Sequence, residues 1–154
     1  MLKGFYLPLF LILSISFSFS QEKILFVGHA YGNPNLKDKK LDSSLINFLN
    51  VNKNDKIIYG GDFIYDIKDT IEIKNFLKFN SKFNYVLIPG NHDVGLKFLN
   101  HQKTRFEQIN NNLLIYLNTN FNSTTEILKV VEEIKNEINK DYKNILIFSH
   151  QLFY

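Results

Sequence analysis

Four apolar runs of this chain each end at polar side chains that can bind a metal ion. The runs and the residues that follow them are 24–27 before Gly28-His29, 57–59 before Gly60-Gly61-Asp62, 85–88 before Pro89-Gly90-Asn91-His92-Asp93, and 145–148 before Ser149-His150. Short apolar runs bounded by Gly and Pro are typical of buried strands. Because open α/β sheets hold their ligands at the carboxyl ends of strands, these side chains predict a metal site at that end.

Helical patterns lie between the expected strands. Three helices are expected, with N-terminal signals at Asp42, at the pair Asp69 and Glu72, and at the pair Ser123 and Glu126. A further strand is expected over residues 113–117, whereas residues 94–112 give only a weak helical pattern. This alternation of strands and helices predicts an α/β fold in which helices cover a sheet.

Three of the strand-end motifs, in this order along the chain, resemble the calcineurin-like metallophosphoesterases. They are Gly61-Asp62, Gly90-Asn91-His92-Asp93 and Ser149-His150, and the second is the most specific. The resemblance runs from Ile24 to the end of the chain. It implies the N-terminal part of a four-layer α/β/β/α sandwich, with helices on the outer face of the sheet. It also implies a dinuclear site for two divalent or trivalent metal ions, with Mn, Fe or Zn expected.

The resemblance implies a role for each motif residue. Asp62 would bridge the two ions, and Asn91 and His150 would bind the second of them. His92 is not expected to be a ligand; it would face the leaving oxygen, with Asp93 fixing its orientation. The structural alternatives are a plain Gly-Gly-Asp turn for Asp62 and a hydrogen-bonded histidine at a strand end for His150.

The first motif departs from the family pattern. The family has Asp-x-His after its first strand, where this chain has His29-Ala30-Tyr31. His29 can still bind a transition metal. Tyr31 can ligate a ferric ion as a phenolate, point its hydroxyl at the substrate, or simply pack in the loop. Losing one carboxylate should weaken the first cation site or shift its preference toward Zn or Fe.

A second departure concerns Tyr65. In Gly61-Asp62-Phe63-Ile64-Tyr65 it takes the last position of the family's Gly-Asp-x-x-Asp motif. Purple acid phosphatases have a tyrosine at this position, and there it is an iron ligand. Tyr65 is therefore a further candidate metal ligand, and Asp66 is expected to be a helix or loop carboxylate.

A third departure lies at the C-terminal end. The family supplies two more histidines from a Gly-His-x-His motif after the Ser-His strand, and this sequence ends four residues past His150. We therefore expect residues 21–154 to be a C-terminally truncated domain, poorly active or inactive alone. A sheet face or edge should be uncovered in it. His101 has no motif around it and is expected on the surface.

Composition excludes several classes of function. The chain has no cysteine, which rules out disulfides, thiol catalysis and thiolate zinc sites. Its 154 residues suggest one domain, with 45% apolar residues for a core. With 18 Lys plus Arg against 15 Asp plus Glu, the net charge of +3 indicates no nucleic-acid partner.

The first twenty residues have the layout of a secretory signal peptide. Lys3 precedes an almost wholly apolar stretch over residues 5–19, and Ser18 and Ser20 are placed for cleavage before Gln21. A retained membrane anchor is the alternative, but the stretch is short for a bilayer core of ~30 Å. We expect a secreted or periplasmic protein, with residues 1–20 as its membrane-associated segment.

Together these observations predict a metal-dependent phosphoesterase that hydrolyses phosphate mono- or diesters through a metal-bound hydroxide. The alternative is a catalytically impaired member of the family that acts as a secreted binding or surface protein. The replacements at His29 and Tyr31 favour the alternative, and the intact Gly-Asn-His-Asp motif favours the enzyme.

Overall fold

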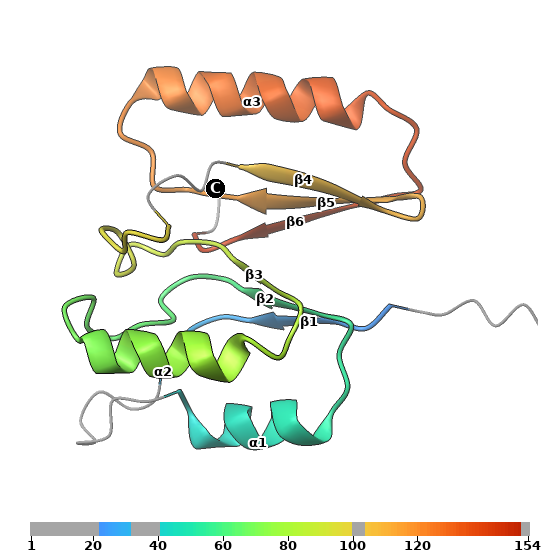
Figure 1. Ribbon diagram of the computed structural model, residues 1–154. Helices are drawn as coiled ribbons and strands as arrows, with labels where there is room; N and C mark the ends of the chain where they lie inside the picture. Colours follow the sequence, from blue (N-terminus) through green and yellow to red (C-terminus); the bar gives the residue numbers. More distant parts are fainter. Residues whose placement is uncertain (1–21, 32–40, 100–103, 152–154) are drawn as a thin grey trace, which may run out of the picture.

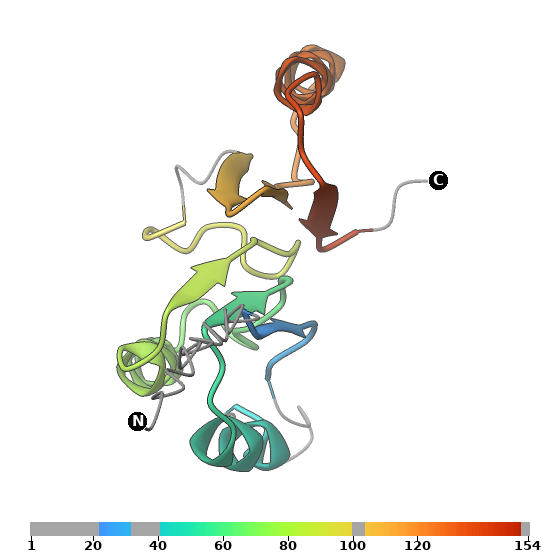
Figure 2. The same ribbon diagram turned by 90° about the vertical axis from the view of Figure 1, so that its right-hand side faces the viewer.

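Two three-stranded sheets lie face to face between layers of helices, in the order α/β/β/α (Figures 1 and 2). The computed structural model describes residues 22–31, 41–99 and 104–151. The expected signal segment, residues 1–20, and His101 lie outside the described residues. Among the described helices, none is long and apolar enough to cross a membrane. The layers are those implied by the family resemblance.

The first sheet is parallel and is built from three of the apolar runs. It contains β1 (Ile24–Val27), β2 (Lys56–Tyr59) and β3 (Tyr85–Leu87), in the order β1-β2-β3. Helices α1 (Ser43–Val51) and α2 (Thr70–Asn80) connect the strands and cover the outer face (Figure 1). Both helices begin at the predicted aspartates, Asp42 and Asp69, whose carboxylates accept hydrogen bonds from main-chain N–H groups of the first turn.

Strand β2 lies at the centre of this sheet and is buried on both faces. Ile57 and Tyr59 pack with Phe76 on the helical side, while Ile58 packs with Leu114 on the side of the second sheet. A strand covered on both faces is apolar throughout rather than alternating. This burial fixes the position of the loop that follows β2, which carries Asp62.

The second sheet is mixed and has α3 over its outer face (Figure 2). Its elements are β4 (Arg105–Ile109), β5 (Asn112–Leu117), α3 (Thr124–Ile138) and β6 (Asn144–Ser149). Strands β4 and β5 are antiparallel, joined by a tight turn in which Asn110 has a φ of +53°. Strands β5 and β6 are parallel, with α3 as their crossover. Ser123 caps α3 as predicted, its hydroxyl accepting a hydrogen bond from the Glu126 N–H.

Strand β4 corrects the weak helical pattern that the sequence suggests over residues 94–112. Three of its residues face the first sheet: Ile109 packs in the inter-sheet cluster, Glu107 pairs with Lys56, and the Arg105 guanidinium lies over a β5 tyrosine ring. Two of these three are charged. The apolar alternation that marks a half-buried strand is therefore hidden in the sequence.

An ion pair joins the two sheets in the interior. The Lys56 ammonium of β2 pairs with Glu107 of β4, and the Tyr116 hydroxyl donates to the second Glu107 oxygen at 2.7 Å. Burial raises the pKa of Glu107, but the hydrogen bonds from Lys56 and Tyr116 and the charge of Lys56 outweigh it. The pKa of Glu107 is therefore below its ordinary value.

Replacing Glu107 by Gln should lower the free energy of unfolding at neutral pH by about 3 kcal/mol, because the buried Lys56 ammonium loses its counter-charge. A carboxylate with a lowered folded-state pKa stabilises above its unfolded-state pKa, and this contribution is lost as pH falls through the folded-state pKa. When urea unfolding is measured at decreasing pH, the free energy of unfolding should therefore fall less steeply for the variant than for wild type. The control is Glu132→Gln at an exposed position of α3. If the free energy of unfolding fell equally with decreasing pH in wild type and Glu107→Gln, the Lys56–Glu107 pair would not be the source of this stability.

Strand β6 lies at the edge of the second sheet, and the described residues leave much of it exposed. Ile145, Leu146 and Ile147 are 41%, 43% and 56% exposed. Phe148, the next residue, stacks on Phe26 of β1 with ring centroids 5.7 Å apart, and this contact ties the two sheets together near the site. The exposure of β6 residues that point to opposite faces shows an edge strand with little cover.

Candidate metal centre

The loops that follow β1, β2, β3 and β6 bring four predicted ligands together. His150 Nε2 lies 3.1 Å from Asn91 Oδ1 and 3.5 Å from Asp62 Oδ2. His29 Nδ1 lies 3.7 Å from the same Asp62 oxygen. Two imidazoles, a carboxylate and an amide oxygen form a donor set that suits a transition-metal ion. The strand-end residues that the sequence singles out therefore do converge, and they fit a metal.

Glycines allow these loops to approach one another. The φ of Asp62 is +51° and that of Gly61 is +93°, both in the left-handed region. A Cβ on Gly61 would overlap the His150 ring, and a Cβ on Gly90 would overlap the Asp62 carboxylate. Glycine at these two positions is therefore a packing requirement of the site as well as a turn signal.

The buried Asp93 carboxylate fastens two of the loops together. It accepts hydrogen bonds from the main-chain N–H groups of Asp62 at 2.7 Å, Gly90 at 2.9 Å and Phe63 at 3.2 Å. Burial raises the pKa of Asp93, and the hydrogen bonds from Gly90 and Asp62 oppose that shift. Asp93 thus holds the main chain beneath Asp62 in place.

These contacts differ from the role that the family resemblance implies, in which Asp93 orients the His92 ring. The Asp93 side chain is fully buried, whereas His92 is exposed. His92 is tied to the site through its main chain instead, because its N–H donates to Asp62 Oδ1 at 3.1 Å. The other Asp62 oxygen, Oδ2, faces the two histidines.

His150 is oriented by the loop after β2. Its Nδ1 lies 2.8 Å from the Gly60 carbonyl oxygen, a contact in which Nδ1–H donates. In the neutral ring this leaves the lone pair of Nε2 directed at Asn91 and Asp62. A main-chain carbonyl behind a ligating histidine fixes the tautomer in the same way at known metal sites.

Tyr31 and Tyr65 form an aromatic wall beside His29. Their ring centroids are 5.6 Å apart, and the Tyr31 ring lies 5.8 Å from that of His29. Burial raises the pKa of Tyr31, and the negative charge of Asp62 raises it further. This favours the neutral phenol over the phenolate. The structure therefore places both tyrosines beside the metal donors.

The contacts of two residues that support the loops of the site could not be predicted from the sequence. Glu72 was expected to complete a capping box; its carboxylate instead accepts hydrogen bonds from the Tyr65 N–H at 2.7 Å and the Asp66 N–H at 3.1 Å. Asn120, in the loop before α3, donates to the Pro89 carbonyl oxygen at 2.9 Å. The partners are main-chain groups in every case. No motif marks such contacts in a sequence.

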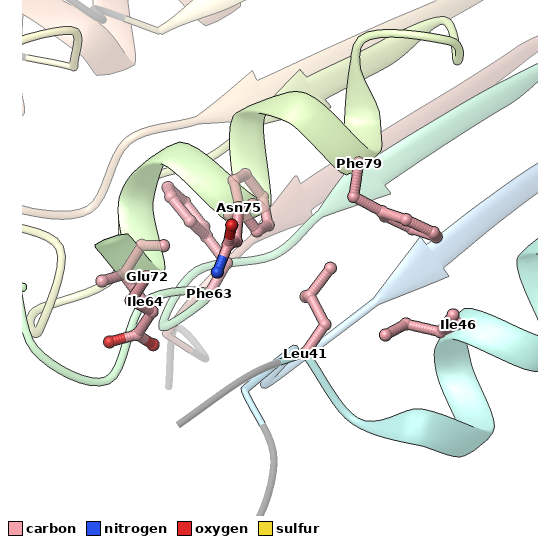
Figure 3. A pocket seen from close by; sticks show the side chains of 8 residues that line it. Leu41, Ile46, Phe63, Ile64, Glu72, Asn75 and Phe79 are labelled. Atoms are coloured by element: carbon pink, nitrogen blue, oxygen red, sulfur yellow. The ribbon is translucent and has the colours of Figure 1, made fainter. Parts of the chain in front are cut away.

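An apolar pocket of about 240 Å³ lies beside the loop that follows β2, between α1 and α2 (Figure 3). Phe63, Ile64, Phe76 and Phe79 supply much of its lining. Glu72 also borders it, but both carboxylate oxygens of Glu72 are used by the loop. None of the four metal donors lines this pocket.

Comparisons with known proteins bear on the same residues. A family model described as calcineurin-like phosphoesterase matches residues 26–151. The search of curated proteins finds no significant match. Among solved structures, a single mutant of Vps29 from Entamoeba histolytica is similar at 11% sequence identity and a TM-score of 0.41, over 73% of this chain. This chain spans 58% of the length of that Vps29 chain.

Proposed function

The chain belongs to the calcineurin-like phosphoesterase family, and we propose that it hydrolyses phosphate mono- or diesters in a metal-dependent reaction. The observation that carries the proposal is the convergence of Asp62, Asn91, His150 and His29 from four separate strand ends. A transition metal bound there supplies positive charge to the phosphoryl oxygens and lowers the pKa of a water molecule. The substrate enters this proposal only by class, as a phosphate ester.

The side chains around the donors have separate tasks in this reaction. The buried Asp62 carboxylate and the Asn91 amide oxygen present hard oxygen ligands, and the His150 ring presents a nitrogen whose direction Gly60 fixes. His92 stands next to Asn91 with an exposed ring. That position suits transfer of a proton to the leaving oxygen of a phosphate ester.

We expect the purified chain to release p-nitrophenol slowly from p-nitrophenyl phosphate mono- or diesters when Mn²⁺ or Zn²⁺ is added. This hydrolysis should stop when EDTA is added. Replacing His92 by Ala should lower kcat about 100-fold, the usual size of a general acid's contribution. Replacing the exposed Asp141 by Asn is the control and should leave kcat unchanged. Unaltered turnover in the His92 variant would refute its role; no bound metal and no turnover would defeat the hydrolase proposal.

A second candidate is a family member with impaired catalysis that acts as a secreted binding protein. It is favoured by the first motif, where His29 and Tyr31 replace the family's Asp and His. Metal content and turnover measured on one preparation separate the two. Tight metal binding and retention of inorganic phosphate, without release of p-nitrophenol under any metal, is the outcome that supports the second candidate over the first.

A further inference from the structure

We infer that the four donors hold one cation between them, rather than one cation of a pair, an inference that rests on the metal dependence proposed above. Donor atoms bound to one ion at ~2.1 Å lie roughly 3–4 Å apart. His150 Nε2 lies 3.1 Å from Asn91 Oδ1 and 3.5 Å from Asp62 Oδ2, and His29 Nδ1 lies 3.7 Å from the same Asp62 oxygen. The donor atoms of His29, Asp62 and His150 all lie within 4.8 Å of one another.

The polarity of the contacts calls for a cation at this point. With Nδ1–H donating to the Gly60 carbonyl, the neutral His150 ring has only a lone pair at Nε2. That lone pair faces two oxygens, Asn91 Oδ1 and Asp62 Oδ2, which are acceptors as well. With the ring neutral, three acceptors converge at this point, and a metal ion would satisfy all three at once.

Asp62 is presented in a way that suits one ion. Its Oδ1 accepts the His92 N–H, and its Oδ2 faces the two histidines. Both histidines approach that same oxygen, His150 at 3.5 Å and His29 at 3.7 Å. His29 takes the family's aspartate position in the first motif. Here the His29 ring lies next to Asp62, with its centroid 5.6 Å from that of the His150 ring.

A second cation would need further donors of its own. In the described part of the chain, His29, Asp62 and His150 are the group of His, Asp and Glu side chains close enough to share an ion. The Tyr31 ring makes T-shaped contacts with the rings of Tyr65 and His29. Among their His, Asp and Glu side chains, the described residues therefore supply one such donor group. Its two imidazoles select Zn²⁺, Co²⁺ or Fe²⁺ over Mg²⁺ and Ca²⁺, which prefer all-oxygen sites.

The metal count of the 154-residue chain tests this inference without any assay of turnover. Native mass spectrometry and calorimetric titration with Zn²⁺ should both give one ion per chain. Two ions of similar affinity, or none, would overturn it. Replacing His29 by Ala should weaken Zn²⁺ binding by more than roughly 100-fold, since even residues behind a ligand contribute about 10–100-fold. Unchanged affinity in this variant would also overturn the inference.

A matched histidine variant completes the design. His92→Ala removes an imidazole from the same edge of the molecule and should leave the Zn²⁺ count and affinity as in wild type. An equal loss in both histidine variants would overturn the assignment of His29. The outcomes also separate this inference from the hydrolase proposal. One zinc per chain without turnover would defeat only the hydrolase, whereas two zincs with turnover would defeat only the single-ion site.

Discussion

Replacing Asp93 by Asn should lower the free energy of unfolding by roughly 4 kcal/mol, near the upper end for a single substitution. The carboxylate accepts hydrogen bonds from the main-chain N–H groups of Asp62, Gly90 and Phe63. An amide has one oxygen, and its NH₂ group would face N–H donors. Because Asp93 is fully buried, water cannot take over these bonds. Urea unfolding followed by circular dichroism measures the change.

The control for this variant is Asp141→Asn on the exposed turn before β6, which should change stability by less than about 0.5 kcal/mol. The Asp93 variant should also hold the loop that carries Asp62 less firmly, and this should weaken metal binding. Zn²⁺ affinity of the Asp93 variant is expected to fall about 10–100-fold, as for other residues that support a ligand. A variant as stable as wild type would show that Asp93 does not fasten the loops.

Replacing Asp62 by Asn should abolish Zn²⁺ binding, because it removes the one carboxylate that both histidines approach. Asn tolerates the positive φ of +51° at this position, so the loop itself should be kept. Zn²⁺ at about 100 times its Kd should stabilise the wild-type chain by about 2.7 kcal/mol, and the variant by nothing. Thermal unfolding with and without Zn²⁺ measures this difference.

The matched control is Asp42→Asn, the same chemical change at the N-cap of α1. Asn caps a helix about as well as Asp, so this variant should unfold at nearly the wild-type temperature. It should also keep the full stabilisation by Zn²⁺. If Asp62→Asn retained that stabilisation as well, Asp62 would not be a ligand, and the metal centre would have to be placed elsewhere.

The strands and helix starts were predictable because their signals are local. Residues 57–59 of β2 and 113–117 of β5 are continuous apolar runs, as buried strands require. Asp42, Asp69 and Ser123 cap helices through hydrogen bonds to their own first turns. Strand β4 was not predictable in this way. Its inward face carries Glu107, whose partner Lys56 is distant in sequence, so the pattern that marks a strand is replaced by an ion pair.

The ligand cluster was predictable in part. Residue types at strand ends gave Asp62, Asn91, His150 and His29, because parallel strands deliver their carboxyl ends to one edge. The role of Asp93 was not predictable. Its partners are main-chain N–H groups, and every residue except proline has one. The same limit applies to Asn120, whose amide holds the Pro89 carbonyl.

The metal-centre account depends most directly on where a cation binds. Anomalous diffraction from crystals of the Zn²⁺-loaded chain locates the ion without reference to activity. We predict one peak bounded by Asp62 Oδ2, Asn91 Oδ1, His150 Nε2 and His29 Nδ1, with zinc–ligand distances of about 2.0–2.2 Å. A peak at other side chains, with these four donors uncoordinated, would contradict it.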